Sequence, residues 1–103
     1  MSEKEKAVLL SVPNISGNEL KYVKECLETG WISSAGSYVD KFEQMVADYA
    51  GAKYAIATMN GTAALHIALL LAGVKPKDYV IVSNMTFVAS ANSIKYAGAD
   101  PIL

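Results

Sequence analysis

Apolar residues recur at helical spacing early in the chain. They return every three or four positions as far as Gly30, which predicts one amphipathic helix with the apolar positions Leu20, Val23, Cys26 and Leu27. Ser16 and Glu19 have the spacing of a capping box, so we expect this helix to begin there. Residues 1–15 precede it as a charged N-terminal arm that continues into an apolar stretch.

A second helical pattern follows a short loop at residues 31–36. Ser37 and Asp40 form another capping box, and the helix it opens is expected to end at Gly51. Its predicted apolar face consists of Val39, Phe42, Val46 and Tyr49.

From residue 54 short apolar runs alternate with helical stretches. We predict a strand at 54–58, a helix at 62–72, a strand at 79–83, a helix at 87–97 and the start of a third strand at 101–103. This alternation favours an α/β fold, with a parallel sheet covered by helices. Because the sequence stops where a strand begins, we expect it to be part of a longer domain.

Composition adds that this chain has more apolar surface than it can bury. Hydrophobic residues make up 52% of its 103 positions and charged residues only 18%. A chain of this length buries a smaller share of its surface than a full-sized domain. Further sequence or another copy must cover the remainder, so we expect a homo-oligomer.

Charge argues against polyanionic partners. The formal net charge is −1, the nine basic residues are dispersed lysines, and nucleic acid is not an expected partner. Without arginine, anion binding falls mainly to backbone groups. Cys26 is the single cysteine, the N-terminus does not resemble a signal peptide, and the apolar stretch 63–74 is too short for a membrane span. We therefore expect a cytoplasmic protein.

Asn60-Gly61-Thr62-Ala63 stands between a predicted strand and a predicted helix. The first amides of such a helix can bind a phosphate, Gly61 allows close approach, and the Thr62 hydroxyl can donate a further hydrogen bond. The alternative is an ordinary helix start that Asn60 or Thr62 merely caps, and spacing alone favours this alternative. A hairpin at Asn60-Gly61 is disfavoured because a helical segment follows.

A second junction, residues 83–87, leaves the next predicted strand. Both junctions are expected at the carboxyl edge of the sheet, where open α/β sheets bind ligands. Phe87 could stack there on a flat heterocycle, although packing in the core is the simpler interpretation. His66 is interpreted as a helix-packing or surface residue, Cys26 as a small core residue and Trp31 as a packing anchor. None of them has partners at a metal-binding or nucleophilic spacing.

Taken in order, these segments resemble the DegT/DnrJ/EryC1/StrS aminotransferases, which aminate keto-sugars attached to nucleotides. The resemblance runs from about Val12 to Leu103. It rests on Gly30-Trp31-Ile32, on Gly36 with Val39, Phe42 and Glu43, and on the segments NGTAALHIAL, DYVIVSNMTFVASANSI and GADPIL.

The resemblance implies the fold type I architecture of vitamin B6 enzymes. Residues 16–103 would form the N-terminal part of the large domain: helices, then strand, helix, strand, helix and strand. The implied cofactor is pyridoxal 5′-phosphate. Glutamate or glutamine would be the amino donor, and a keto-sugar nucleotide the acceptor.

The resemblance also assigns residues. Gly61, Thr62 and Ala63 would hold the cofactor phosphate, and Phe87 would stack on the pyridine ring. Transamination also needs a Schiff-base lysine and a carboxylate for the pyridine nitrogen, which in the family come from later sequence. No lysine here matches the family's Schiff-base motif, so we expect the chain alone to be inactive.

Two other functions fit the residues. One is a noncatalytic α/β module that binds a phosphorylated ligand at the helix start formed by Gly61 and Thr62. The other is a segment that binds no ligand and associates with copies of itself.

Overall fold

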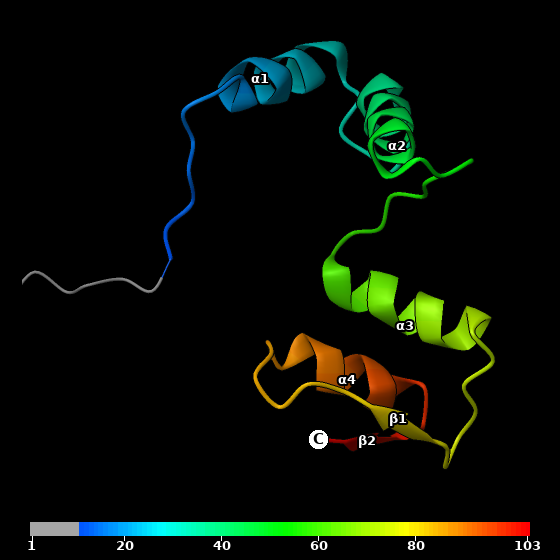
Figure 1. Cartoon of the computed structure of the whole chain (residues 1–103). Coiled ribbons are helices and arrows are strands. Elements are labelled where there is room, and N and C mark those ends of the chain that lie inside the picture. Colours follow the sequence, from blue (N-terminus) through cyan, green and yellow to red (C-terminus); the bar gives the residue numbers. More distant parts are fainter. Residues whose placement is uncertain (1–10) are drawn as a thin grey trace, which may run out of the picture. The chain divides into compact units, whose positions relative to one another are not determined.

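The computed structural model describes residues 11–103 and divides after Lys41 into two compact units. In chain order the elements are helices α1 (Glu19–Thr29), α2 (Ser37–Ala50) and α3 (Gly61–Leu71), strand β1 (Tyr79–Ile81), helix α4 (Ala89–Tyr96) and strand β2 (Asp100–Ile102) (Figure 1). The predicted order of helices followed by alternating elements is therefore confirmed in outline. Of the predicted N-terminal arm, residues 1–10 lie outside the described residues, and 11–16 carry no helix or strand.

The predicted capping box at the start of α1 is wrong. The helix begins at Glu19, its N-cap is Asn18, and no side chain caps it. Glu19 is the first helical residue, and its Oε2 atom accepts the N–H of Gly17 at 2.8 Å. Ser16 lies outside the helix, and the Glu19 carboxylate that would have completed the box is bonded to Gly17 instead. The end at Gly30 is confirmed, with this residue in the left-handed conformation.

Helix α2 begins where the sequence predicted, but a backbone carbonyl, and not a side chain, accepts its first amides. The carbonyl of Gly36 accepts the N–H groups of Val39 at 2.9 Å and Asp40 at 3.2 Å. Ser37 is thus the first residue inside the helix, one position later than a capping residue would stand. The predicted box at Ser37 and Asp40 located the helix, although a different group satisfies its first amides.

The second unit contains a two-stranded parallel sheet. Strand β1 pairs with β2 in the register Tyr79 to Asp100, Val80 to Pro101 and Ile81 to Ile102. Helix α4 connects the two strands and packs against β2, while α3 packs against α4 (Figure 1). Helix α4 therefore lies between α3 and the sheet.

Most of the buried residues lie in α4 and the turn that follows it. Ile94 is 3% exposed and Ala99 fully buried, and Ala47 and Ala97 complete the apolar core. Ser93 is also buried, and its hydroxyl donates to the carbonyl of Ser90 at 2.8 Å, so its polar atom is satisfied. Many large apolar side chains remain exposed, as the composition predicted.

Residues 54–58 form no hydrogen-bonded strand, which corrects the first predicted strand. They run as an irregular segment from α2 towards α3 (Figure 1). A strand exists only when another strand satisfies its backbone groups, and the sheet of the second unit contains β1 and β2 alone. The apolar composition of residues 54–58 was therefore not enough to predict a strand.

The junction between β1 and α4 is longer than predicted. Strand β1 ends two residues earlier than expected, and α4 begins at Ala89 instead of Phe87. Polar side chains occupy the interval: the Ser83 hydroxyl accepts the N–H of Met85 at 3.3 Å, and the Thr86 and Ser90 hydroxyls lie 3.1 Å apart. Such local hydrogen bonds compete with regular structure at both ends of a loop.

Candidate phosphate site

The start of α3 is capped by a side chain. Asn60 is the N-cap in an extended conformation, and its Oδ1 atom accepts the N–H of Ala63 at 2.9 Å. The Asn60 carbonyl accepts the N–H of Ala64 at 3.2 Å and the Thr58 hydroxyl at 3.0 Å. The capping role that the sequence offered for Asn60 is therefore present.

Two amides of the same turn are left for other acceptors. The N–H groups of Gly61 and Thr62 stand at the first two helical positions, where no carbonyl of the helix can reach them. The positive end of the helix dipole lies at the same place and favours an anion. Beyond the neighbouring residues and the backbone of its own helix, no atom lies within 4 Å of the point where a Cβ of Gly61 would stand, so the backbone is open to close approach.

Thr62 and Ala63 line a shallow pocket of about 410 Å³ together with Asn60, His66 and Tyr96. The rings of His66 and Tyr96 meet edge to face, with centroids 6.0 Å apart. Sequence reasoning did not include these two residues in the site. His66 follows Thr62 by four positions and so shares its helix face. Tyr96 gives no comparable signal because it reaches the pocket through the packing of α4 on α3.

Phe87 lies apart from this pocket. It stands in the loop between β1 and α4, is 81% exposed, and is not among the residues that line the pocket. Its exposure overturns the simpler interpretation of Phe87 as a core residue. The structure therefore brings Thr62 and Ala63 into one pocket and leaves the Phe87 ring free to contact a flat ligand.

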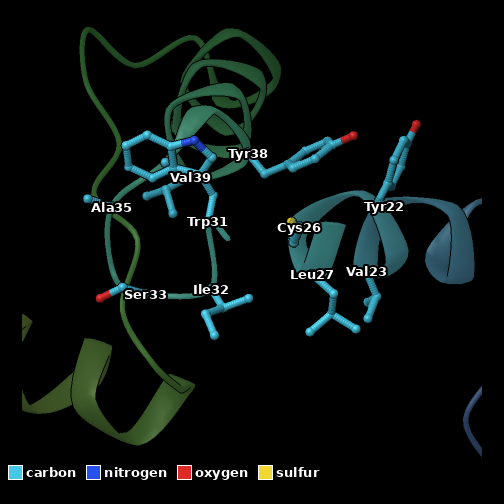
Figure 2. A pocket seen from close by; sticks show the side chains of 11 residues that line it. Tyr22, Val23, Cys26, Leu27, Trp31, Ile32, Ser33, Ala35, Tyr38 and Val39 are labelled. Atoms are coloured by element: carbon cyan, nitrogen blue, oxygen red, sulfur yellow. The ribbon is translucent and has the colours of Figure 1, made fainter. Parts of the chain in front are cut away.

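The first unit has an apolar cavity of its own, of about 500 Å³ (Figure 2). Its walls come from α1, from the loop at residues 31–36 and from the first residues of α2. Trp31 and Cys26 both line it, but Trp31 is 60% exposed and Cys26 only half-buried, so neither is the buried packing residue that the sequence predicted. The lining is dominated by aliphatic and aromatic side chains, so this cavity does not resemble a phosphate site.

Tyr38 makes the principal polar contact near that cavity. Its hydroxyl donates to Oε2 of Glu25 at 2.7 Å, and this hydrogen bond raises the pKa of Tyr38 to about 12. The ring of Tyr38 lies 5.1 Å from that of Tyr22, and Nζ of Lys41 lies 5.9 Å from the Tyr22 ring. These contacts connect α1 to the start of α2.

Two lysines of the second unit, Lys95 and Lys53, have defined side-chain neighbours. Nζ of Lys95 lies 2.6 Å from Oδ1 of Asp100, and Nζ of Lys53 lies 5.1 Å from the ring centre of Tyr54. Between residues 11 and 103, no group of His, Cys, Asp and Glu side chains could hold a metal ion. In the same range, no helix has the length and apolarity needed to cross a membrane.

The fold and the helix start together define a class of protein. The α/β arrangement is that of part of the large domain of fold type I pyridoxal-phosphate-dependent transferases, to judge from the solved structures that it matches. Residues 13–103 match the DegT/DnrJ/EryC1/StrS aminotransferase family, and the chain belongs to that family. The family resemblance noted in the sequence is confirmed.

Individual relatives are similar over nearly the whole chain but only part of their own length. GDP-perosamine synthase of Caulobacter vibrioides is 51% identical over 96 residues, which are 93% of this chain and 26% of that protein. A putative sugar aminotransferase, Spr1654 of Streptococcus pneumoniae, solved in its PMP form, has a TM-score of 0.80 at 33% identity and covers 92% of this chain and 24% of its own. NtdA of Bacillus subtilis with bound PMP has a TM-score of 0.75 at 33% identity. The chain thus spans about a quarter of the length of the curated relatives it matches.

Proposed function

We propose that this chain supplies the phosphate-binding part of a pyridoxal-phosphate-dependent sugar aminotransferase. The reaction of the whole enzyme would transfer an amino group from glutamate or glutamine to a keto-sugar nucleotide, in the cytoplasm. Family membership supports the class, and the name of the GDP-perosamine synthase relative supports a nucleotide-sugar substrate. The observation that carries the proposal is the pair of helix-start amides at Gly61 and Thr62, which lack an intrahelical acceptor.

The residues present fit a phosphate, with one adjustment. Gly61 and Thr62 offer their amides, and Thr62 adds a hydroxyl at the rim of the pocket. The amide of Ala63 already donates to Oδ1 of Asn60, and this oxygen would repel a phosphate bound beside it. Ala63 can therefore contribute its amide only after the Asn60 side chain rotates away from the cap.

Phe87 completes the proposed cofactor site by stacking on the pyridine ring. Its exposed aromatic face and its place in the loop after β1 support this role. When bound, pyridoxal phosphate supplies the electron-withdrawing ring that makes transamination possible. This chain's own residues would anchor the phosphate and hold one face of that ring.

Cofactor titration tests the assignment. In a protein that contains this segment, Thr62→Val removes one hydrogen bond to a charged group and should weaken pyridoxal phosphate binding by roughly 1.5–3 kcal/mol. Phe87→Ala should weaken binding as well. Thr29→Val is the matched control, because the Thr29 hydroxyl donates to the carbonyl of Glu25 at 2.7 Å within α1 and should leave affinity unchanged. Unchanged affinity in both Thr62→Val and Phe87→Ala would remove both residues from the site.

We also propose that the 103-residue chain alone does not catalyse transamination. None of its lysines matches the family's Schiff-base motif, and Lys95 is engaged with Asp100. Borohydride reduction in the presence of pyridoxal phosphate, followed by peptide mapping, should label no lysine stoichiometrically. One fully labelled lysine would contradict the proposal.

Self-association of the chain is the remaining part of the proposal. Exposed apolar side chains such as Tyr54, Ile56 and Ile81 support it, together with backbone groups at 54–58 that no strand satisfies. Sedimentation velocity should show oligomers whose fraction rises with concentration. Ile56→Pro removes one backbone donor from the segment and should reduce that fraction, whereas a monomer at all concentrations would exclude association.

A further inference from the structure

The carboxylate of Glu43, on α2, reaches the backbone of the segment that leads to α3. Its Oε1 atom accepts the N–H of Ala57 at 2.7 Å, and both residues are half-buried. A hydrogen bond of this length to a charged acceptor is among the stronger kinds in proteins. Since no strand pairs with residues 54–58, the carboxylate supplies the Ala57 amide with an acceptor that no strand provides.

This contact begins a run of hydrogen bonds that ends at the helix start. After Ala57, the Thr58 hydroxyl donates to the carbonyl of Asn60, and the Asn60 side chain accepts from Ala63. Ala57 stands four positions before Gly61, so its placement limits where the first amides of α3 can lie. A carboxylate on one helix thereby fixes the approach to the start of another.

The neighbouring residue on α2 shows what an ordinary surface contact looks like. Nε2 of Gln44 donates to Oδ1 of Asp48 at 2.8 Å, within a single exposed turn of helix. That bond stabilises the helix by a few tenths of a kcal/mol and fixes no other segment. The Glu43 contact instead joins residues 14 positions apart in the sequence.

We propose that Glu43 is a positioning residue of the phosphate site. By accepting the Ala57 amide, it holds the irregular segment so that the amides of Gly61 and Thr62 converge on one anion. The first step, that Glu43 holds the segment through Ala57, concerns the chain alone. The second step, that the held segment favours phosphate binding, rests on the proposed function. An acceptor oxygen is the property that matters, so glutamine at this position retains the role in part and alanine loses it.

Amide hydrogen exchange on the 103-residue chain tests the first step, at a concentration where sedimentation shows the chain to be monomeric. Glu43→Ala should speed exchange at Ala57 by roughly 10- to 100-fold, the loss of one hydrogen bond to a charged acceptor. Glu43→Gln should recover part of the protection. Gln44→Ala controls for any loosening of α2, and the Val82 amide, bonded to the Ile102 carbonyl at 2.9 Å, reports the integrity of the sheet. Exchange at Ala57 in Glu43→Ala as slow as in the unaltered chain would overturn the inference.

Titration of the same variants with inorganic phosphate and with pyridoxal phosphate tests the second step. The readout is the chemical shift of the Gly61 and Thr62 amides, which does not require catalysis. We expect Glu43→Ala to weaken binding about tenfold, Glu43→Gln less, and Gln44→Ala not at all. If the unaltered chain binds and Glu43→Ala binds equally well, Glu43 has no positioning role. If the unaltered chain shows no shift with either ligand, the phosphate site fails, while the exchange data still decide the contact with Ala57.

Discussion

The two units of the chain use similar helices in different ways. In the second unit, α4 lies between α3 and the sheet, and Ile94 and Ala99 are almost completely buried. In the first unit, helix α1 has the apolar periodicity of a packed helix, yet it contains no buried residue. Its contacts are a tyrosine pair, a hydrogen bond from Tyr38 to Glu25 and a shallow cavity.

This difference shows that periodicity predicts a helix and not the surface that covers it. Leu20, Val23 and Leu27 repeat at helical spacing, and all are more than half exposed in the structure. Burial contributes about 25 cal/mol for each Å² of apolar surface removed from water, and α1 obtains little of it. The first unit should therefore respond weakly to changes that are damaging in the second.

The largest expected effect is the loss of the Ile94 side chain. Ile94→Ala should lower the free energy of unfolding by roughly 2–5 kcal/mol, because it removes buried methyl groups and leaves a cavity between α4 and its neighbours. Leu27→Ala is the matched change in the first unit, where the side chain is 65% exposed, and it should cost about 0.5 kcal/mol or less. Urea denaturation measures both. Similar losses in the two variants would mean that α1 is buried in solution.

Two glycines with the same backbone conformation sharpen the comparison further. Gly98 and Gly30 both have φ near +78°, which costs a residue with a side chain about 1 kcal/mol or more. A Cβ at Gly98 would also lie 3.1 Å from Cβ and 3.2 Å from Cα of Pro76, whereas a Cβ at Gly30 would meet no atom within 4 Å. Gly98→Ala should therefore destabilise the chain more than Gly30→Ala.

The same denaturation measurements check this second pair. The difference between the two variants isolates the contact with Pro76, since the conformational cost is common to both. Equal losses would show that the turn around Pro76 moves aside without resistance.

How far the sequence predicted the fold depends on what each signal requires. Local signals placed α1 and α2 and the end at Gly30, because the backbone hydrogen bonds of a helix lie within the segment itself. The predicted strand at 54–58 is wrong because a strand also needs a partner, which no property of those residues reveals. Strand β1 was predicted from the same kind of apolar run, and it forms because β2 lies beside it.

The candidate site likewise contains features that the local sequence predicted and features that it did not. The helix start at Gly61 and Thr62 was predicted from local chemistry, and the Asn60 cap was one of its stated alternatives. Tyr96 and the contact of Glu43 with Ala57 were not predicted because each depends on packing between separate elements. The roles of Gly61, Thr62, Ala63 and Phe87 in cofactor binding stay predictions.

A smaller difference in the free energy of unfolding is expected between two exposed ion pairs, one taken from each unit. Lys95 and Asp100 lie 2.6 Å apart and connect α4 to β2, whereas Lys24 and Glu28 lie 3.7 Å apart within α1. We expect Lys95→Met to cost about 0.5–1 kcal/mol and Lys24→Met about 0.3 kcal/mol or less. Repeating the denaturation at high salt should diminish both losses, since salt screens exposed charges. A larger loss for Lys24→Met would reverse the ranking.

The smallest expected effect belongs to the first unit and appears only at high pH. The hydrogen bond to Glu25 raises the pKa of Tyr38 to about 12 from its ordinary value of 10.0. Below pH 10 the Tyr38 phenol is protonated in both the folded and the unfolded state, so the stabilisation is fully present. Between pH 10 and 12 the folded state retains a proton that the unfolded state loses, and the free energy of unfolding falls as the pH rises. Phenolate absorbance of the chain minus that of Tyr38→Phe should therefore titrate near pH 12. Glu25→Gln should return that titration towards 10, and a Tyr38 midpoint near 10 in the unaltered chain would show that α1 and α2 do not hold this contact in solution.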